Sequence, residues 1–132
     1  MSKGLKRQAD IAEPALLVRI NQLYRPQMSA EALYEATRGI WKVSGNRRDH
    51  VKYALAVFRG VVVEVYSVDG WARAGSSEYT TRSFEQHELD RRWEFTGTIA
   101  RDDIRSRYLG ASVAHYFVRG NANPVMYLNI GD

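Results

Sequence analysis

Hydrophobic and polar positions alternate along several short stretches of this chain, which is the pattern of β-strands with one face in a core. Near the start, Leu16, Val18 and Ile20 recur at every second position, and we predict a first strand there. A helix over residues 15–24 is the alternative, because the residues of this stretch are not all strand formers.

Two runs rich in valine, tyrosine and phenylalanine, residues 53–58 and 61–68, form the clearest pair of elements. Only Arg59 and Gly60 separate them, and a glycine in a two-residue connection favours a β-hairpin. The second run is almost continuously apolar at its start, which indicates a strand covered on both faces, as in a small closed barrel. Asp69-Gly70 is expected to end it.

Residues 29–37 have the pattern of a short amphipathic helix. Ser29 is a favoured N-cap residue, an acidic residue occupies the first turn, and Gly39 is placed to stop the helix. The apolar stripe is expected to be Ala30, Leu33 and Tyr34, and the solvent-facing side Glu31, Glu35 and Arg38.

The remaining sequence predicts a long connection and further short elements. Residues 71–90 are polar and poor in aliphatic side chains, so we expect a long loop, which in a compact domain is often a lid or a binding loop. The elements predicted after it are a strand at 92–99, a helix at 101–108 ended by Gly110, and strands at 112–118 and 125–130 joined by a turn at 120–124. This order shows no regular alternation of strands and helices and predicts an α+β domain.

Length and composition indicate one globular domain: the chain has 132 residues, of which 45% are hydrophobic. We expect residues 1–13, which lack periodicity, to be a flexible basic arm and residues 14–132 to be the domain. No apolar run reaches the ~20 residues of a membrane span, and we expect a cytoplasmic protein without membrane partners.

The composition also narrows the chemistry. With no cysteine, disulfides, thiolate metal sites and a cysteine nucleophile are excluded, and the 3 histidines are far apart, so we expect neither a metal nor another cofactor. Glycine-rich phosphate loops and the G-x-S-x-G elbow do not occur. The carboxylate pair Asp102-Asp103 is explained by a helix N-terminus, and no catalytic residue is predicted.

The charge pattern points to anionic partners. The formal net charge is +4, and 15 of the 19 cationic residues are arginines. The planar guanidinium group binds phosphates and base edges in a bidentate manner and stacks on rings, so nucleic acid, either DNA or RNA, is the first candidate partner.

Residues 34–43 form the most distinctive segment, because a helix end, Gly39, Trp41 and the cations Arg38 and Lys42 lie within it. These are the ingredients for stacking an aromatic ring while holding its phosphate. The sequence alone leaves open whether the tryptophans line a pocket or plug the core.

The order of a first strand, a short helix, a glycine segment bearing Trp or Lys, and a hairpin resembles the PUA-like superfamily, which includes the EVE, ASCH, YTH and SRA modules. Residues 37–42 stand at the glycine segment and residues 53–68 at the hairpin. The chain is also similar over residues 15–130 to a domain of uncharacterised bacterial proteins, through L-Y-E-A-T-R-G-x-W, A-V-F-x-G-V-V-x-E-V-Y, R-W-E-F-x-G and S-V-A-H-Y-F. The ASCH motif G-x-K-x-x-E-x-R is absent, because Lys42 comes one place late, and the enzymatic ASCH members are therefore poor guides.

This resemblance implies a small PUA-like β-barrel with two or three short helices. It also implies that a base, often a modified one, is flipped into an aromatic cage, here in a bacterial defence or RNA-handling system. The base pocket is expected to comprise Arg38, Trp41, Lys42, Trp71 and Tyr79. The expected phosphate contacts are Arg47, Arg48, Lys52, Arg105 and Arg107.

Two other functions remain open on the sequence alone. One is a small hydrolase or transferase acting on a nucleoside, with Lys42 and either Glu35 or Glu64 as acid and base. The other is a protein-interaction subunit, for example a homodimer, that binds no nucleic acid.

Overall fold

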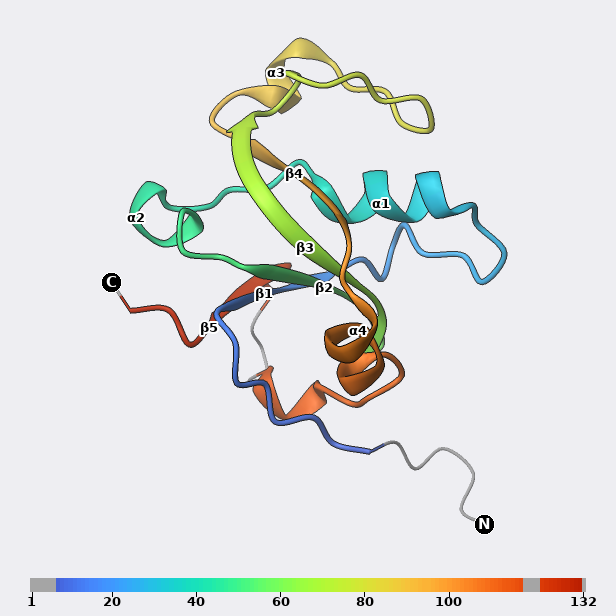
Figure 1. The fold of residues 1–132 in the computed structure, drawn as a ribbon. Helices are drawn as coiled ribbons and strands as arrows, with labels where there is room; N and C mark the ends of the chain where they lie inside the picture. The colour runs from blue at the N-terminus through green and yellow to red at the C-terminus, as the bar shows by residue number, and fades with distance from the viewer. Residues whose placement is uncertain (1–6, 118–121, 132) are drawn as a thin grey trace.

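A mixed five-stranded sheet in the order β4-β3-β2-β1-β5 organises the chain (Figure 1). The computed structural model describes residues 7–117 and 122–131. Its elements in chain order are β1 (Ala15–Arg19), α1 (Ala30–Arg38), α2 (Gly45–Arg48), β2 (Tyr53–Phe58), β3 (Val61–Arg73), α3 (Gln86–Leu89), β4 (Trp93–Ile99), α4 (Asp102–Tyr108), the 3-10 helix η1 (Ala114–Tyr116) and β5 (Val125–Leu128).

The sheet pairs neighbouring strands in both senses. β1 is parallel to β2 and antiparallel to β5, while β2, β3 and β4 form an antiparallel meander. Within the described residues β4 and β5 lie at opposite ends of this order and do not pair, so the sheet is not closed into the expected barrel. The described chain is therefore a small α+β protein with an open mixed sheet and four short α-helices.

β1 is covered on both faces, as its alternating side chains show. Ala15 and Leu17 belong to the core formed with α4, whereas Leu16 and Val18 belong to the core formed with α1 and Trp41. All four side chains are fully buried. This interior strand of the sheet therefore contributes to two cores, and each core gains stability from the apolar surface that it removes from water.

The packed domain begins earlier than Pro14. Ala9 and Ile11 are buried in the α4 core, and the Ala9 amide donates a 2.9 Å hydrogen bond to the Ser112 carbonyl. Residues 7–13 are thus part of the domain, because their apolar side chains pack in the core with α4. Residues 1–6 of the expected arm lie outside the described residues.

Most predicted elements are present. The first strand, the helix at 29–37, the hairpin, the strand at 92–99, the helix at 101–108 and the last strand all appear near their expected bounds. Ser29 caps α1 as predicted, since its hydroxyl accepts a 3.0 Å hydrogen bond from the Ala32 amide.

Three predictions differ from the structure. β3 does not end at Asp69-Gly70: a bulge between Val68 and Gly70 absorbs the irregularity and the strand pairs with β4 as far as Arg73. The predicted strand at 112–118 contains the 3-10 helix Ala114–Tyr116 instead. Only Ser112 of the described part of this stretch forms a β-bridge, to Val61 and to Gln8, and residue 118 lies outside the described residues. The short helices α2 and α3 were not predicted, because single turns have almost no periodicity.

No helix in the described ranges is both long enough and apolar enough to cross a membrane.

Candidate functional site

Two clefts contain sequence-predicted residues, and they divide these residues between them. The larger, about 830 Å³, is called here the Trp41 cleft and also contains Lys42. The smaller, about 530 Å³, is called the Trp71 cleft and also contains Arg48 and Lys52. Trp41 and Trp71 therefore do not line a single hollow.

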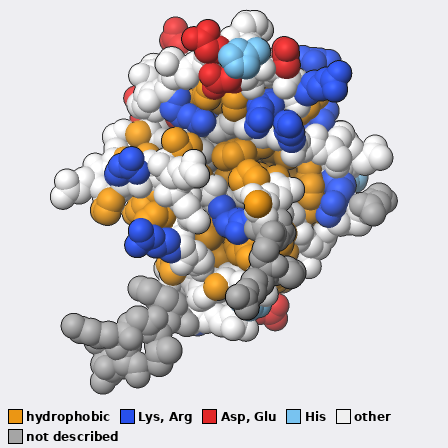
Figure 2. Space-filling model, turned by 180° about the vertical axis from the view of Figure 1, so that it is seen from behind, with side chains coloured by type: hydrophobic (Ala, Val, Ile, Leu, Met, Phe, Trp, Pro, Cys, Tyr) orange, Lys and Arg blue, Asp and Glu red, His pale blue; other side chains and the backbone are white. Residues whose placement is uncertain are grey.

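The Trp41 cleft lies between the end of β1, the chain after α1, and the loop that leads to β4. Its apolar lining is Ile20, Leu23, Ile40, Trp41, Phe84, Ala122 and Pro124. Its cationic lining is Arg19, Lys42, Arg82 and Arg92, against the acidic residues Glu88 and Asp90. Figure 2 shows hydrophobic side chains in a hollow of this face, with Lys and Arg side chains around them and acidic side chains and a histidine along the upper rim.

Trp41 is first of all a core residue. Only 9% of it is exposed, and its indole Nε1–H donates a 2.8 Å hydrogen bond to the Thr37 carbonyl. Its backbone extends the sheet, because Trp41 and Trp93 exchange amide-to-carbonyl hydrogen bonds of 2.9 and 2.8 Å. Trp41 thus contributes only a small exposed surface to the cleft. The neighbouring Lys42 is exposed and has no hydrogen bond or ion pair with any described residue.

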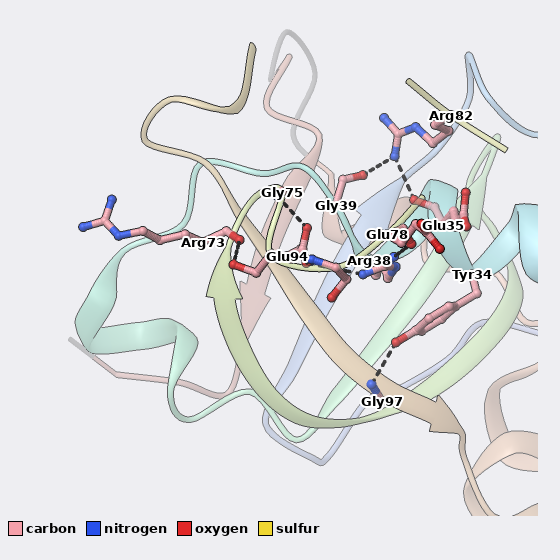
Figure 3. Close-up of polar contacts among 12 residues, drawn as sticks. Tyr34, Glu35, Arg38, Gly39, Arg73, Gly75, Glu78, Arg82, Glu94 and Gly97 are labelled. Atoms are coloured by element: carbon pink, nitrogen blue, oxygen red, sulfur yellow. Dashed lines mark hydrogen bonds and ion pairs between the residues drawn. The ribbon is translucent and has the colours of Figure 1, made fainter. Parts of the chain in front are cut away.

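Two buried carboxylates hold the loop that forms one wall of the Trp41 cleft, and Figure 3 shows the contact of one of them, Glu94, with Gly75. Glu35 of α1 accepts hydrogen bonds from the backbone amides of Thr80 (2.9 Å) and Thr81 (2.8 Å), and from both threonine hydroxyls. Glu94 of β4 accepts hydrogen bonds from the amides of Gly75 (2.9 Å) and Ser77 (2.8 Å). The loop expected to be a lid or a binding loop is therefore held at two places, around residues 75–77 and at residues 80–81.

The exposure predicted for α1 is wrong at three positions. Glu35 and Arg38 are 3% and 4% exposed, although both were expected to face solvent, and Ala30 is exposed instead. Burial by itself would raise the pKa of the Glu35 carboxyl, but the hydrogen bonds from Thr80 and Thr81 outweigh it and lower that pKa below its ordinary value. A buried charge is acceptable here because the loop supplies its partners.

Arg38 and Tyr79 lie behind the wall of the cleft rather than in it. The Arg38 guanidinium pairs with Glu94 at 3.5 Å, donates a 3.0 Å hydrogen bond to the Glu78 carbonyl, and lies 4.0 Å from the centre of the Tyr79 ring. Burial raises the pKa of the Tyr79 hydroxyl. Neither residue lines the Trp41 cleft or the Trp71 cleft, so both are structural supports of the loop.

Three residues of the cleft wall were not selected from the sequence: Arg82, Phe84 and Arg92. Arg82 donates a 2.7 Å hydrogen bond to the Glu35 carbonyl and another to the Gly39 carbonyl, and its guanidinium lies 4.7 Å from the centre of the Phe84 ring. An arginine and an aromatic residue close together in a polar loop would have been the sequence signal for this wall.

The Trp71 cleft brings together Arg48, Lys52 and Trp71, with Asp49 and Asp69 balancing the two cations. The Arg48 guanidinium lies 3.5 Å from the centre of the Trp93 ring. Because its cationic and acidic residues are equal in number, this cleft is a weaker attractor for a polyanion than the Trp41 cleft.

The other predicted phosphate contacts lie elsewhere. Arg47 lies over the Tyr127 ring at 4.1 Å. Arg105 pairs with the buried Glu64 at 2.7 Å, and Arg107 pairs with Glu13 at the same distance. None of these three arginines lines either cleft. In addition, the charges of Arg105 and Arg107 are compensated by the carboxylates of Glu64 and Glu13.

The acid–base pairs considered from the sequence are not assembled. Glu35 is bound to the loop, Glu64 is bound to Arg105, and neither lines the cleft that contains Lys42. Among residues 7–117 and 122–131, no three His, Cys, Asp or Glu side chains are grouped so that they would hold a metal ion.

Comparison of the chain with protein-family models, with curated proteins and with solved structures finds no match.

Proposed function

We propose that this protein is a nucleic-acid-binding domain and that the Trp41 cleft holds a base and its phosphates. The supporting observation is that one cleft of about 830 Å³ combines an apolar floor with four cationic and two acidic residues. A cleft of this volume is in the ordinary range of ligand sites, and its excess positive charge favours a phosphate-bearing ligand.

The apolar lining of the Trp41 cleft is suited to the flat face of a base. Phe84 offers apolar surface, and the small exposed parts of Ile40 and Trp41 add to it. Stacking of a base on an aromatic side chain is worth about 1–3 kcal/mol, which offsets the few kcal/mol needed to take a base out of a stack.

The cations are suited to the phosphates. Lys42 is exposed and has no partner among the described residues, whereas the Arg92 guanidinium makes only a long, 3.4 Å hydrogen bond to the Ile40 carbonyl. Both groups therefore reach a phosphate without breaking a strong contact. The finer proposal, a PUA-like module that takes a modified base in a bacterial defence or RNA-handling system, is supported by the sequence resemblance.

The test is the affinity of single-stranded DNA and RNA, measured by fluorescence anisotropy over a series of salt concentrations. We expect affinity to fall as salt rises, and Lys42→Ala to weaken binding and reduce the slope of log affinity against log salt by about 1. The matched control is Arg101→Ala, which removes one charge at an exposed position outside both clefts. Binding that is indifferent to salt, or equally weakened by both variants, would refute the proposal.

A further inference from the structure

Asp90 is the feature of the Trp41 cleft that phosphate binding does not explain. The two acidic residues of the cleft differ in what they contact: Glu88 caps α3, since its carboxylate accepts the Glu85 amide, whereas no described residue forms a hydrogen bond or ion pair with the Asp90 carboxylate. Asp90 is also exposed. The cleft therefore contains one carboxylate that is free to contact a ligand.

A free carboxylate next to a phosphate site selects against ligands that bring only negative charge. It repels a bare phosphate, but it accepts hydrogen bonds from N–H groups of the same ligand. A ligand that satisfies both Lys42 and Asp90 carries a phosphate and, separated from it, a group with N–H donors. A nucleotide whose base presents donors fits this description.

The chemistry of the bases then favours one of them. A carboxylate has two oxygens side by side, and guanine presents two adjacent donors, N1–H and the N2 amino group, on its Watson–Crick edge. Cytosine and adenine present one amino group beside an acceptor nitrogen, and uracil and thymine present one N–H between two carbonyls. Only guanine thus gives the carboxylate two hydrogen bonds without placing an acceptor against it.

We propose that the Trp41 cleft selects guanine through Asp90, with Lys42 on the phosphate side of the same nucleotide. This inference rests on the proposed nucleic-acid binding. Asp90 is here a specificity residue that contacts the base edge.

The experiment compares three short single-stranded probes in ribose and deoxyribose forms: uridine or thymidine throughout, the same with one central guanine, and the same with hypoxanthine in its place. Hypoxanthine lacks the amino group of guanine and keeps N1–H. For the unchanged protein we expect the guanine probe to bind roughly tenfold more tightly than the other two. Asp90→Asn should remove this difference, because an amide has one acceptor oxygen and one donor nitrogen, and it should leave the pyrimidine probe bound at least as tightly.

Asp69→Asn is the matched control, because it makes the same chemical change in the Trp71 cleft and should keep the preference for guanine. Equal binding of the guanine and hypoxanthine probes, or a preference that survives in Asp90→Asn, overturns the inference. If all probes bind equally tightly and with a salt dependence that Lys42→Ala reduces, only guanine selection fails. If no probe binds, the proposed function fails with it.

Discussion

Glu35 and Arg82 join α1 to the loop before β4 from both directions. The Glu35 carboxylate accepts the amides of the loop residues Thr80 and Thr81, while Arg82 returns a 2.7 Å hydrogen bond to the Glu35 backbone carbonyl. This reciprocal contact fixes the wall of the Trp41 cleft that carries Phe84, Asp90 and Arg92. The preformed cleft thus depends on a residue that does not line it.

Replacing Glu35 should loosen this wall. In Glu35→Gln one carboxylate oxygen becomes an amide nitrogen, and at least one of the Thr80 and Thr81 amides loses its acceptor. We expect the free energy of unfolding to fall by about 1–3 kcal/mol in a urea titration. Nucleic-acid affinity should fall as well, because the ligand must then order the loop. Glu31→Gln on the exposed first turn of α1 is the control and should change neither quantity.

The same carboxylate predicts how stability depends on pH. The pKa of Glu35 is lower in the folded protein than its ordinary value of 4.5, so the folded state binds this proton less readily than the unfolded state. Its contribution to stability is therefore complete above pH 4.5 and is lost as the pH falls below 4.5 through the folded pKa. We expect the unchanged protein to lose stability over this range more steeply than Glu35→Gln in matched urea titrations. Parallel curves for the two proteins would contradict this account.

Arg105 should be needed for stability and not for ligand binding. It forms two hydrogen bonds, of 2.7 and 3.2 Å, to the carboxylate of the buried Glu64, so Arg105→Ala leaves that charge without its partner. Breaking a fully buried pair costs about 3–5 kcal/mol, and because the Arg105 side chain is 37% exposed we expect about 2 kcal/mol. Thermal unfolding measures this loss. Unchanged melting, or weakened nucleic-acid binding in the protein that still folds, would place Arg105 in a different role.

Phe84 is a better position than Trp41 at which to test the apolar lining of the Trp41 cleft. Trp41→Ala removes a residue that is 9% exposed and should destabilise the fold by about 3–5 kcal/mol, which would confuse any binding result. Phe84 is only half-buried, and Phe84→Ala should weaken nucleic-acid binding by about 1–3 kcal/mol with a smaller effect on melting. Phe58→Ala, at a half-buried ring on β2 outside the cleft, is the control and should leave affinity unchanged.

Caps, turns and helices that depend on residues close together in the chain were predicted correctly from the sequence. The Ser29 cap, the hairpin turn at Gly60 and the helix at α4 depend on residues close together in the chain, and all three are confirmed. The face of α1 was mispredicted because a helical pattern assigns charged residues to solvent, whereas the partners of Glu35 lie 45 and 46 positions away. No local pattern contains those partners.

The site was harder to predict than the fold for the same reason. The bulge between Val68 and Gly70 carries β3 past its expected end and pairs Trp71 with Phe95 of β4, and Trp71 lines a different cleft from Trp41. Which tryptophan meets which cation is therefore decided by the pairing of β3 with β4. The sequence shows where the cationic and aromatic residues stand in the chain, but their grouping into two clefts depends on the long-range strand register.

The two sides of the Trp41 cleft differ in how freely they can change. On the loop side, substitutions at the residues that contact Glu35 and Glu94 would disturb the loop, and a side chain at Gly39 would collide with the Tyr79 hydroxyl. On the opposite side, Gln22 and Leu23 are exposed and project from the short turn that follows β1. Exchanges at these two positions should therefore reshape the cleft while the contacts that Glu35 and Glu94 make with the loop stay as they are.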